Sequence, residues 1–162
     1  MGTLRQSVHA QYTQGTTTSQ FCQGSSHNCT RQSLQNLNST EITAGLHSLD
    51  PDLRHLATCD RNATSEHLRF ALYDRDLEVR YAAATHPNLT AENIAIALQD
   101  RNREVRSVAI RHQNASESNI NSALDDDCIE IKILALNHPN ATKSNKEKAS
   151  RDPEIAEYLL KQ

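Results

Sequence analysis

A basic residue returns every 26 residues along most of the sequence. The four positions are Arg54, Arg80, Arg106 and Lys132. Evenly spaced cations can bind the phosphates of a nucleic acid or acidic patches on a protein. They can also pair internally with aspartates that return at the same interval, which are Asp74, Asp100 and Asp126. Because the chain has a net charge of −3 and its acidic residues lie in the same region, we favour a structural ladder of ion pairs.

A second regular column contains histidine, which suggests metal binding or proton transfer. Its members are His86, His112 and His138. Equivalent positions of stacked helical units lie about 10 Å apart, whereas a metal needs ligands at about 2 Å. We therefore predict that these histidines pack structurally. An asparagine column two residues later, at Asn62, Asn88, Asn114 and Asn140, is predicted to hydrogen-bond loop backbone groups.

Cysteine and histidine also occur together near the N-terminus, at Cys22, His27 and Cys29. The spacing is not Cys-x2-Cys and no second pair follows, so we predict no metal site. Cys59 and Cys128 are predicted to be thiols. No nucleophile–base set and no glycine-rich phosphate loop is recognisable, so we expect neither an enzyme nor a bound cofactor.

The element that positions these columns is a 26-residue repeat. Its units are residues 46–71, 72–97, 98–123 and 124–149, followed by a partial unit at 150–162. A fixed period of this length is typical of helical pairs that bury their apolar faces against one another. The sequence therefore predicts an all-α, right-handed α-solenoid over residues 36–162. Residues 1–35 are rich in Gln, Ser and Thr and are predicted to be a flexible polar arm.

Capping residues divide each unit into two helices. First helices are predicted to begin at Asp50, Asp76, Asn102 and Asp152, and second helices at Thr64, Thr90, Ser116 and Thr142. Cys128 interrupts the first series, so a frayed start or a cap from Asp127 is expected there. Apolar residues at i, i+3 and i+4 mark the buried faces, as in Val79, Ala82 and Ala83. Lys146 replaces an apolar residue in the fourth unit, as expected for a terminal unit.

These residues resemble known helical repeats. Asp74, Val79 and Arg80 match the HEAT-type signature Asp-x4-Val-Arg. The short period and the His-Pro-Asn-x-Thr turn are similar to the variant leucine-rich repeats of bacteria, and similar tandem units occur in phage proteins. The resemblance implies a binding solenoid. Some variant leucine-rich repeat proteins carry an N-terminal iron–sulfur cluster, but only Cys22 and Cys29 answer that feature here.

An apolar stripe on the first helices exceeds what one buried face needs. Its candidate partner-binding residues are Leu77, Tyr81, Ile110, Arg111, Ile133 and Leu136. The stripe can pack against an adjacent unit, or it can bind a partner or a second copy. We favour packing against the adjacent unit, because solenoid helices are buried on two sides, and keep the partner surface as the alternative.

We expect a protein-binding solenoid that acts as an adaptor or inhibitor of a larger complex. Its size and resemblance suit a phage or mobile-element counter-defence protein of the anti-CRISPR type. The alternative is a HEAT-like protein that binds nucleic acid through the basic ladder. No apolar run reaches the roughly 20 residues of a membrane span and no signal peptide is recognisable. A cytoplasmic protein with no membrane partner is therefore expected, and the Asn-x-Ser/Thr triplets are not read as glycan sites.

Overall fold

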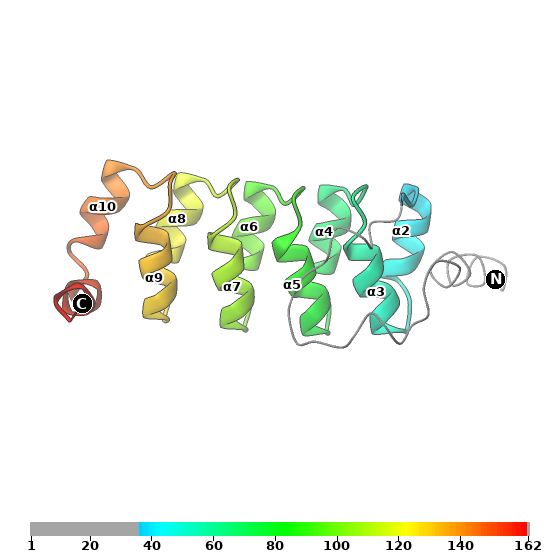
Figure 1. The fold of residues 1–162 in the computed structure, drawn as a ribbon, viewed down its shortest axis with the longest axis horizontal. Helices are drawn as coiled ribbons and strands as arrows, with labels where there is room; N and C mark the ends of the chain where they lie inside the picture. The colour runs from blue at the N-terminus through cyan, green and yellow to red at the C-terminus, as the bar shows by residue number, and fades with distance from the viewer. Residues whose placement is uncertain (1–35, 162) are drawn as a thin grey trace. The chain divides into compact units, whose positions relative to one another are not determined.

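The computed structural model describes residues 36–161, which form ten α-helices and no β-strand. The chain divides into two compact units, Met1–Asn88 and Leu89–Gln162. Figure 1 colours the helices in chain order. The described part is thus all-helical, with packing between neighbouring helices, as the capping pattern predicts. No helix in this range is long and apolar enough to cross a membrane.

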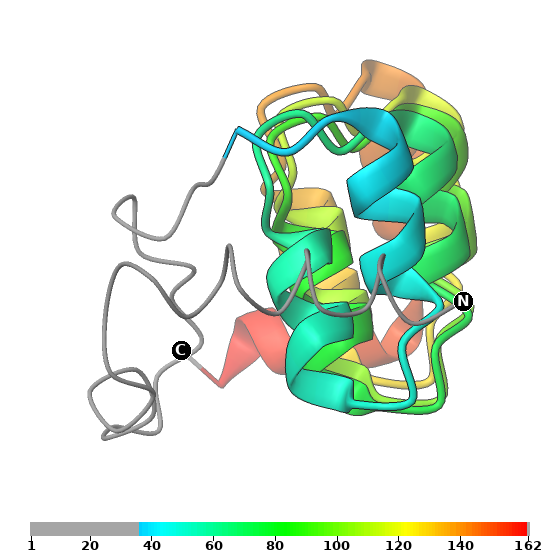
Figure 2. The same ribbon diagram turned by 90° about the vertical axis from the view of Figure 1, so that its right-hand side faces the viewer.

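The first unit contains four described helices. They are α2 (Ser39–Leu46), α3 (Pro51–Thr58), α4 (Ser65–Ala71) and α5 (Leu77–Thr85). Figure 2 shows α3 and α5 in one layer and α2 and α4 in another, and contacts join the helices within each layer and across the layers. A Cβ atom on Gly45 would lie 2.6 Å from the Cβ of Ala57. Glycine at this position therefore permits the close approach of α2 to α3.

The second unit contains six helices. They are α6 (Ala91–Ala97), α7 (Arg103–Ile110), α8 (Glu117–Ala123), α9 (Ile129–Leu136), α10 (Lys143–Ala149) and α11 (Pro153–Leu160). Within this unit α7 packs beside α9, and α8 packs beside both α6 and α10. The last helix, α11, contacts α9 but runs across its direction, so that Figure 1 views α11 along its axis.

The predicted caps begin the helices. Each first-helix cap accepts a hydrogen bond from the backbone N–H two residues ahead. These caps are Asp50, Asp76, Asn102 and Asp152. Each second-helix cap accepts a hydrogen bond from the N–H three residues ahead. These caps are Thr64, Thr90, Ser116 and Thr142. Capping depends on residues two or three positions apart, which explains why these starts are legible in sequence.

The start of α9 differs from the other first helices. Cys128 occupies the N-cap without a side-chain cap bond, and its thiol donates to Oε2 of Glu130. The expected cap from Asp127 was wrong, because the Asp127 carboxylate instead accepts from Arg106 at 2.7 Å. The N-terminal amides of α9 therefore lack the bond that Asp76 and Asn102 provide elsewhere.

We expect Cys128→Asn to stabilise the chain by about 1 kcal/mol, because it copies the cap of Asn102 without adding charge. The converse variant, Asp76→Ala, removes the cap of α5 and should lower the free energy of unfolding by about 1 kcal/mol. Urea unfolding followed by circular dichroism measures both changes. A Cys128→Asn variant less stable than the parent chain would contradict this account of α9.

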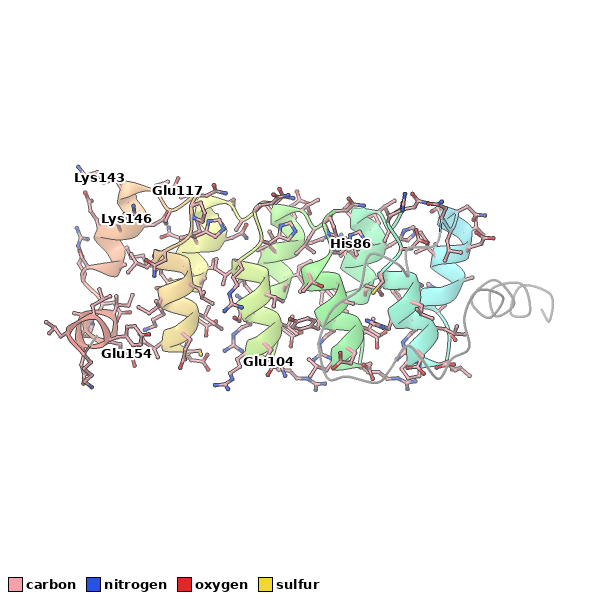
Figure 3. All side chains as sticks on the ribbon, in the orientation of Figure 1. His86, Glu104, Glu117, Lys143, Lys146 and Glu154 are labelled. Atoms are coloured by element: carbon pink, nitrogen blue, oxygen red, sulfur yellow. The ribbon has the colours of Figure 1, made fainter. Side chains whose placement is uncertain are left out.

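The apolar faces pack as the helical spacing predicts in the second helices. All nine predicted positions are buried there: Leu68, Ala71, Leu72, Ile94, Ala97, Leu98, Ile120, Ala123 and Leu124. In the first helices the middle position of the predicted triplet is only partly buried at Leu56, Val108 and Leu134, whereas Ala82 is buried. Lys146 is exposed on α10 (Figure 3), as predicted for this unit.

Candidate functional site

The basic column forms ion pairs inside the fold. Arg54 donates from Nε and Nη2 to the two carboxylate oxygens of Asp74, at 2.7 and 3.0 Å. Arg106 makes the same forked pair with Asp126 at the same two distances. Each arginine thus reaches an aspartate 20 residues ahead, on the loop that leads into the next first helix. Two parallel hydrogen bonds fix both the distance and the orientation of such a pair.

The same guanidinium groups also hold backbone carbonyls. Nη1 of Arg54 donates to the carbonyls of Ser48 and Leu49. Nη1 of Arg80 donates to the carbonyls of Asp74 and Arg75. Arg54 and Arg80 are each only 5 % exposed. These cations therefore join a first helix to the loop that precedes it, and they are structural groups.

The ladder ends with a lysine and a shortened loop. Nζ of Lys132 donates to Asp152 at 2.9 Å and to Glu154 at 2.6 Å. The other carboxylate oxygen of Asp152 accepts the amides of Glu154 and Ile155. One aspartate thus serves both as ion-pair partner and as N-cap. In the loop before α5 these two roles belong to two residues, Asp74 and Asp76. This double role accounts for the two residues that the last unit lacks.

The ion pairs shift the pKa values of their members. Burial by itself raises the pKa of Asp126, but hydrogen bonds from Arg106 and from the Cys128 amide outweigh it, so this pKa lies below 3.8. The pKa of Asp74 is lowered by the same balance. Hydrogen bonds to Glu154 and Asp152 raise the pKa of Lys132. All these groups are therefore charged at neutral pH.

The histidines of the regular column bind loop backbone, as predicted. Nδ1 of His86 accepts the amide of Asn88 at 3.1 Å, and Nε2 lies 3.0 Å from the carbonyl oxygen of Asp60. His138 repeats this arrangement with the amide of Asn140 and the carbonyl of His112. Because Nδ1 accepts, the neutral ring carries its proton on Nε2 and donates it. His86 lies at the loop end of α5 (Figure 3).

The asparagine column tethers each turn to the turn before it. Nδ2 of Asn88 donates to the carbonyls of Arg61 and Ala63, both at 3.0 Å. Nδ2 of Asn140 binds the equivalent carbonyls of Gln113 and Ala115, and the related bonds of Asn62 and Asn114 go to Leu37 and Leu89. A glycan would attach to this nitrogen, so these bonds support the structural interpretation.

A buried polar column on the second helices escaped the sequence analysis. Its members are His67, Asn93, Asn119 and Asn145. Nδ2 of Asn119 donates to the carbonyl of Ala91 at 3.1 Å, and its Oδ1 accepts from Ser116. Each member occupies the third position of its helix, opposite the capping Thr or Ser. The repeated polar residue three positions after the cap was the signal that predicts a capping box.

We expect acidification from pH 7 to pH 5 to destabilise the first unit. Burial lowers the pKa of His67 below 6.5, and burial likewise lowers that of His55. A base with a depressed folded pKa contributes its full stability above the unfolded value of 6.5, and that contribution falls as the pH drops below it. Nδ1 of His67 accepts the Thr64 amide, which a protonated ring cannot do.

The repeat itself supplies the control for this prediction. His67→Asn places in the first unit the residue found at Asn93 and Asn119, and it removes one titrating group. Thermal melts at pH 7 and pH 5 should show a smaller loss in His67→Asn than in the parent chain. An equal loss in the two proteins would exclude a contribution from His67.

The predicted partner-binding residues differ in how far each is exposed. Ile110 is fully buried, so its assignment to a binding surface was wrong. Arg111 is exposed, and the remaining four members are partly buried: Leu77, Tyr81, Ile133 and Leu136. Leu77 and Tyr81 belong to the first compact unit, and Arg111 and the α9 residues belong to the second. The burial of Ile110 depends on neighbouring helices, so the apolar spacing within its own helix does not predict it.

The most exposed large apolar residues were missed by the sequence analysis. Within residues 36–161 they are Leu49, Phe70, Tyr73, Leu159 and Leu160. Three of them lie in the first unit, near the loop before α3 and the end of α4. The last two belong to α11, where Leu159 occupies a position that is alanine in every preceding first helix. A comparison of equivalent positions in successive units distinguishes these residues in the sequence.

The cysteines partly follow expectation. Cys128 is a free thiol. Cys59 is disulfide-bonded, so its assignment as a thiol was wrong. Cys22, His27 and Cys29 lie outside the described residues 36–161. Between residues 36 and 161, no group of three or more His, Cys, Asp or Glu side chains is arranged to hold a metal ion.

The chain was compared with known protein families, proteins and structures. No protein-family model, curated protein or solved structure that was compared with the chain matches it. The likeness to HEAT-type and variant leucine-rich repeats therefore stays a resemblance of the repeated residues.

Proposed function

We propose that the chain is a right-handed α-solenoid that binds another protein, as an adaptor or an inhibitor of a larger complex. The support is the recurrence of one set of tethers: a forked ion pair, a histidine and an asparagine that each reach a neighbouring turn. Repeat proteins of this kind hold partners on the extended surface that their units build together.

The outer stripe of α9 is the observation that carries the proposal. Ile129, Ile133 and Leu136 are all partly exposed, and they lie about half a turn from the buried Ile131. At the same three places α3 has Pro51, His55 and Thr58, and α7 has Arg103, Ser107 and Ile110. Packing of the repeat therefore does not require three aliphatic residues here, whereas an exposed apolar patch is typical of a protein-binding surface.

The ladder geometry argues against the alternative of nucleic-acid binding. Arg54 is 5 % exposed and Lys132 is 9 % exposed, and both are bound to carboxylates. A phosphate track needs cations that face solvent and release counterions on binding. The exposed ends of the first helices instead carry acids, among them Glu104 and Glu130.

Capture of a partner from the natural host tests the proposal. The variant combines Ile133→Ser with Leu136→Thr, which copies Ser107 and Thr58 from other units and so preserves the fold. Ser118→Ala, an exposed change on α8, is the matched control. We expect a captured protein to be depleted tenfold or more by the double variant, at an unchanged melting temperature, and to persist after nuclease treatment. Capture that is lost on nuclease treatment would favour nucleic acid.

A further inference from the structure

The first unit presents an aromatic and basic surface that shares no residue with the stripe of α9. Tyr73 is 70 % exposed, Phe70 is 46 % exposed and Leu49 is 80 % exposed. The ring of His47 stacks on Phe70 with centroids 4.6 Å apart. Nη2 of Arg75 donates to the carbonyl of Leu49 at 3.4 Å, which joins the two loops. We call Leu49, Phe70, Tyr73 and Arg75 the aromatic–arginine patch.

The repeat does not need these apolar side chains. The positions equivalent to Tyr73 in the next two units hold Gln99 and Asp125, and those equivalent to Leu49 two and three units later hold Arg101 and Asp127. The position of Phe70 becomes Ser122 in the third unit. Since polar residues serve these places on the same scaffold, core packing does not explain the exposed apolar residues of the patch.

The charges around the patch indicate what it binds. Arg75 is exposed, as is Arg69, which lies one turn before Tyr73 on α4. Among the described residues no carboxylate lies within ion-pair distance of Arg69 or Arg75, whereas Arg54 is bound to Asp74. Two unpaired guanidinium groups beside aromatic rings suit carboxylates, which arginine binds with two parallel hydrogen bonds. Tyr, Phe and Arg are also the side chains enriched at the centres of protein interfaces.

The surrounding charge favours a peptide over a polyanion. Residues 36–88 contain eight Asp and Glu residues against five Arg residues and no Lys. A nucleic acid brings one negative charge per nucleotide against this acidic unit. A peptide needs only one or two carboxylates, placed at the two arginines.

We propose that the aromatic–arginine patch binds an acidic peptide segment of a partner protein, with one or two carboxylates beside a large apolar side chain. The apolar side chain packs among Phe70, Tyr73 and Leu49. The carboxylates accept hydrogen bonds from Arg75 and Arg69. This surface lies on α4, on the loop that follows α4 and on the loop before α3. It does not include the α9 stripe, so the two assignments fail independently.

Selection from a random peptide display library on the full chain tests the proposal. Counter-selection uses the variant Phe70→Ser, Tyr73→Gln and Arg75→Gln, whose first two changes copy later units. We expect enriched peptides that combine Asp or Glu with Phe, Trp or Leu. Absence of enrichment, or enrichment of basic or uncharged peptides, would overturn the proposal.

Binding of one enriched peptide, measured by fluorescence anisotropy, then separates the contributions. Tyr73→Gln and Arg75→Gln should each raise the Kd tenfold or more, and so should replacement of the peptide's Asp and Glu by Asn and Gln. Ile133→Ser, in the α9 stripe, is the matched control and should leave the Kd unchanged. An unchanged Kd in Tyr73→Gln or Arg75→Gln, or Tyr73-dependent competition by a single-stranded oligothymidine, would overturn the assignment to an acidic peptide.

Discussion

Asp126→Ala should destabilise the chain by about 2–3 kcal/mol, because it removes the forked pair of a largely buried guanidinium. Of its bonds to carboxylates, Arg106 then keeps only the single one to the exposed Asp127. The side chains of Asp126 and Arg106 are 6 % and 12 % exposed in this pair. Urea unfolding at pH 7 measures the change. The combined substitution of Arg54, Arg80 and Arg106 by alanine should lower the melting temperature further, since it removes the same bonds from several units.

The chain offers a matched control next to this residue. Asp125 pairs with Lys148, but its side chain is 68 % exposed, and an exposed pair contributes about 0 to 1 kcal/mol. Asp125→Ala should therefore have little effect. Equal losses in the two variants would show that the ladder does not stabilise the fold.

The pH dependence of the same variant checks the cause. The pKa of Asp126 is lowered below 3.8, so its contribution is fully present above that value and is lost as the pH falls through the folded pKa. The difference in stability between Asp126→Ala and the parent chain should shrink below about pH 4. A difference that persists in strong acid would have a cause other than the ion pair.

Ile120→Ala should destabilise the chain by about 2–5 kcal/mol, because it removes three carbons from a fully buried site and leaves a cavity. Ile120 is 0 % exposed and occupies the middle of α8. Ser122→Ala on the same helix is exposed and should change stability by less than about 0.5 kcal/mol. Thermal and urea unfolding compare the two variants. Similar melting temperatures would contradict the assignment of the buried face of α8.

Local features of the sequence determined the helices and their buried faces. Asp76 and Thr90 predict helix starts because a cap bond spans only two or three residues. Val105 and Ile120 predict core positions because apolar spacing follows the helical turn. The exchange of an apolar residue for Lys146 likewise predicts an exposed position. Each inference depends on residues within one helix, so one sequence suffices.

The tertiary structure decided which residues of different units meet. The interval of 20 residues between Arg106 and Asp126 is visible in the sequence, but the forked geometry depends on how a first helix lies against the next loop. The burial of Ile110 and the exposure of Tyr73 depend on neighbouring helices, which the spacing within one helix does not describe. Asp152 shows the same limit, because its double role appears only once the loop has brought it to Lys132. Pairing and exposure are properties of packed surfaces, so only the tertiary structure determined them.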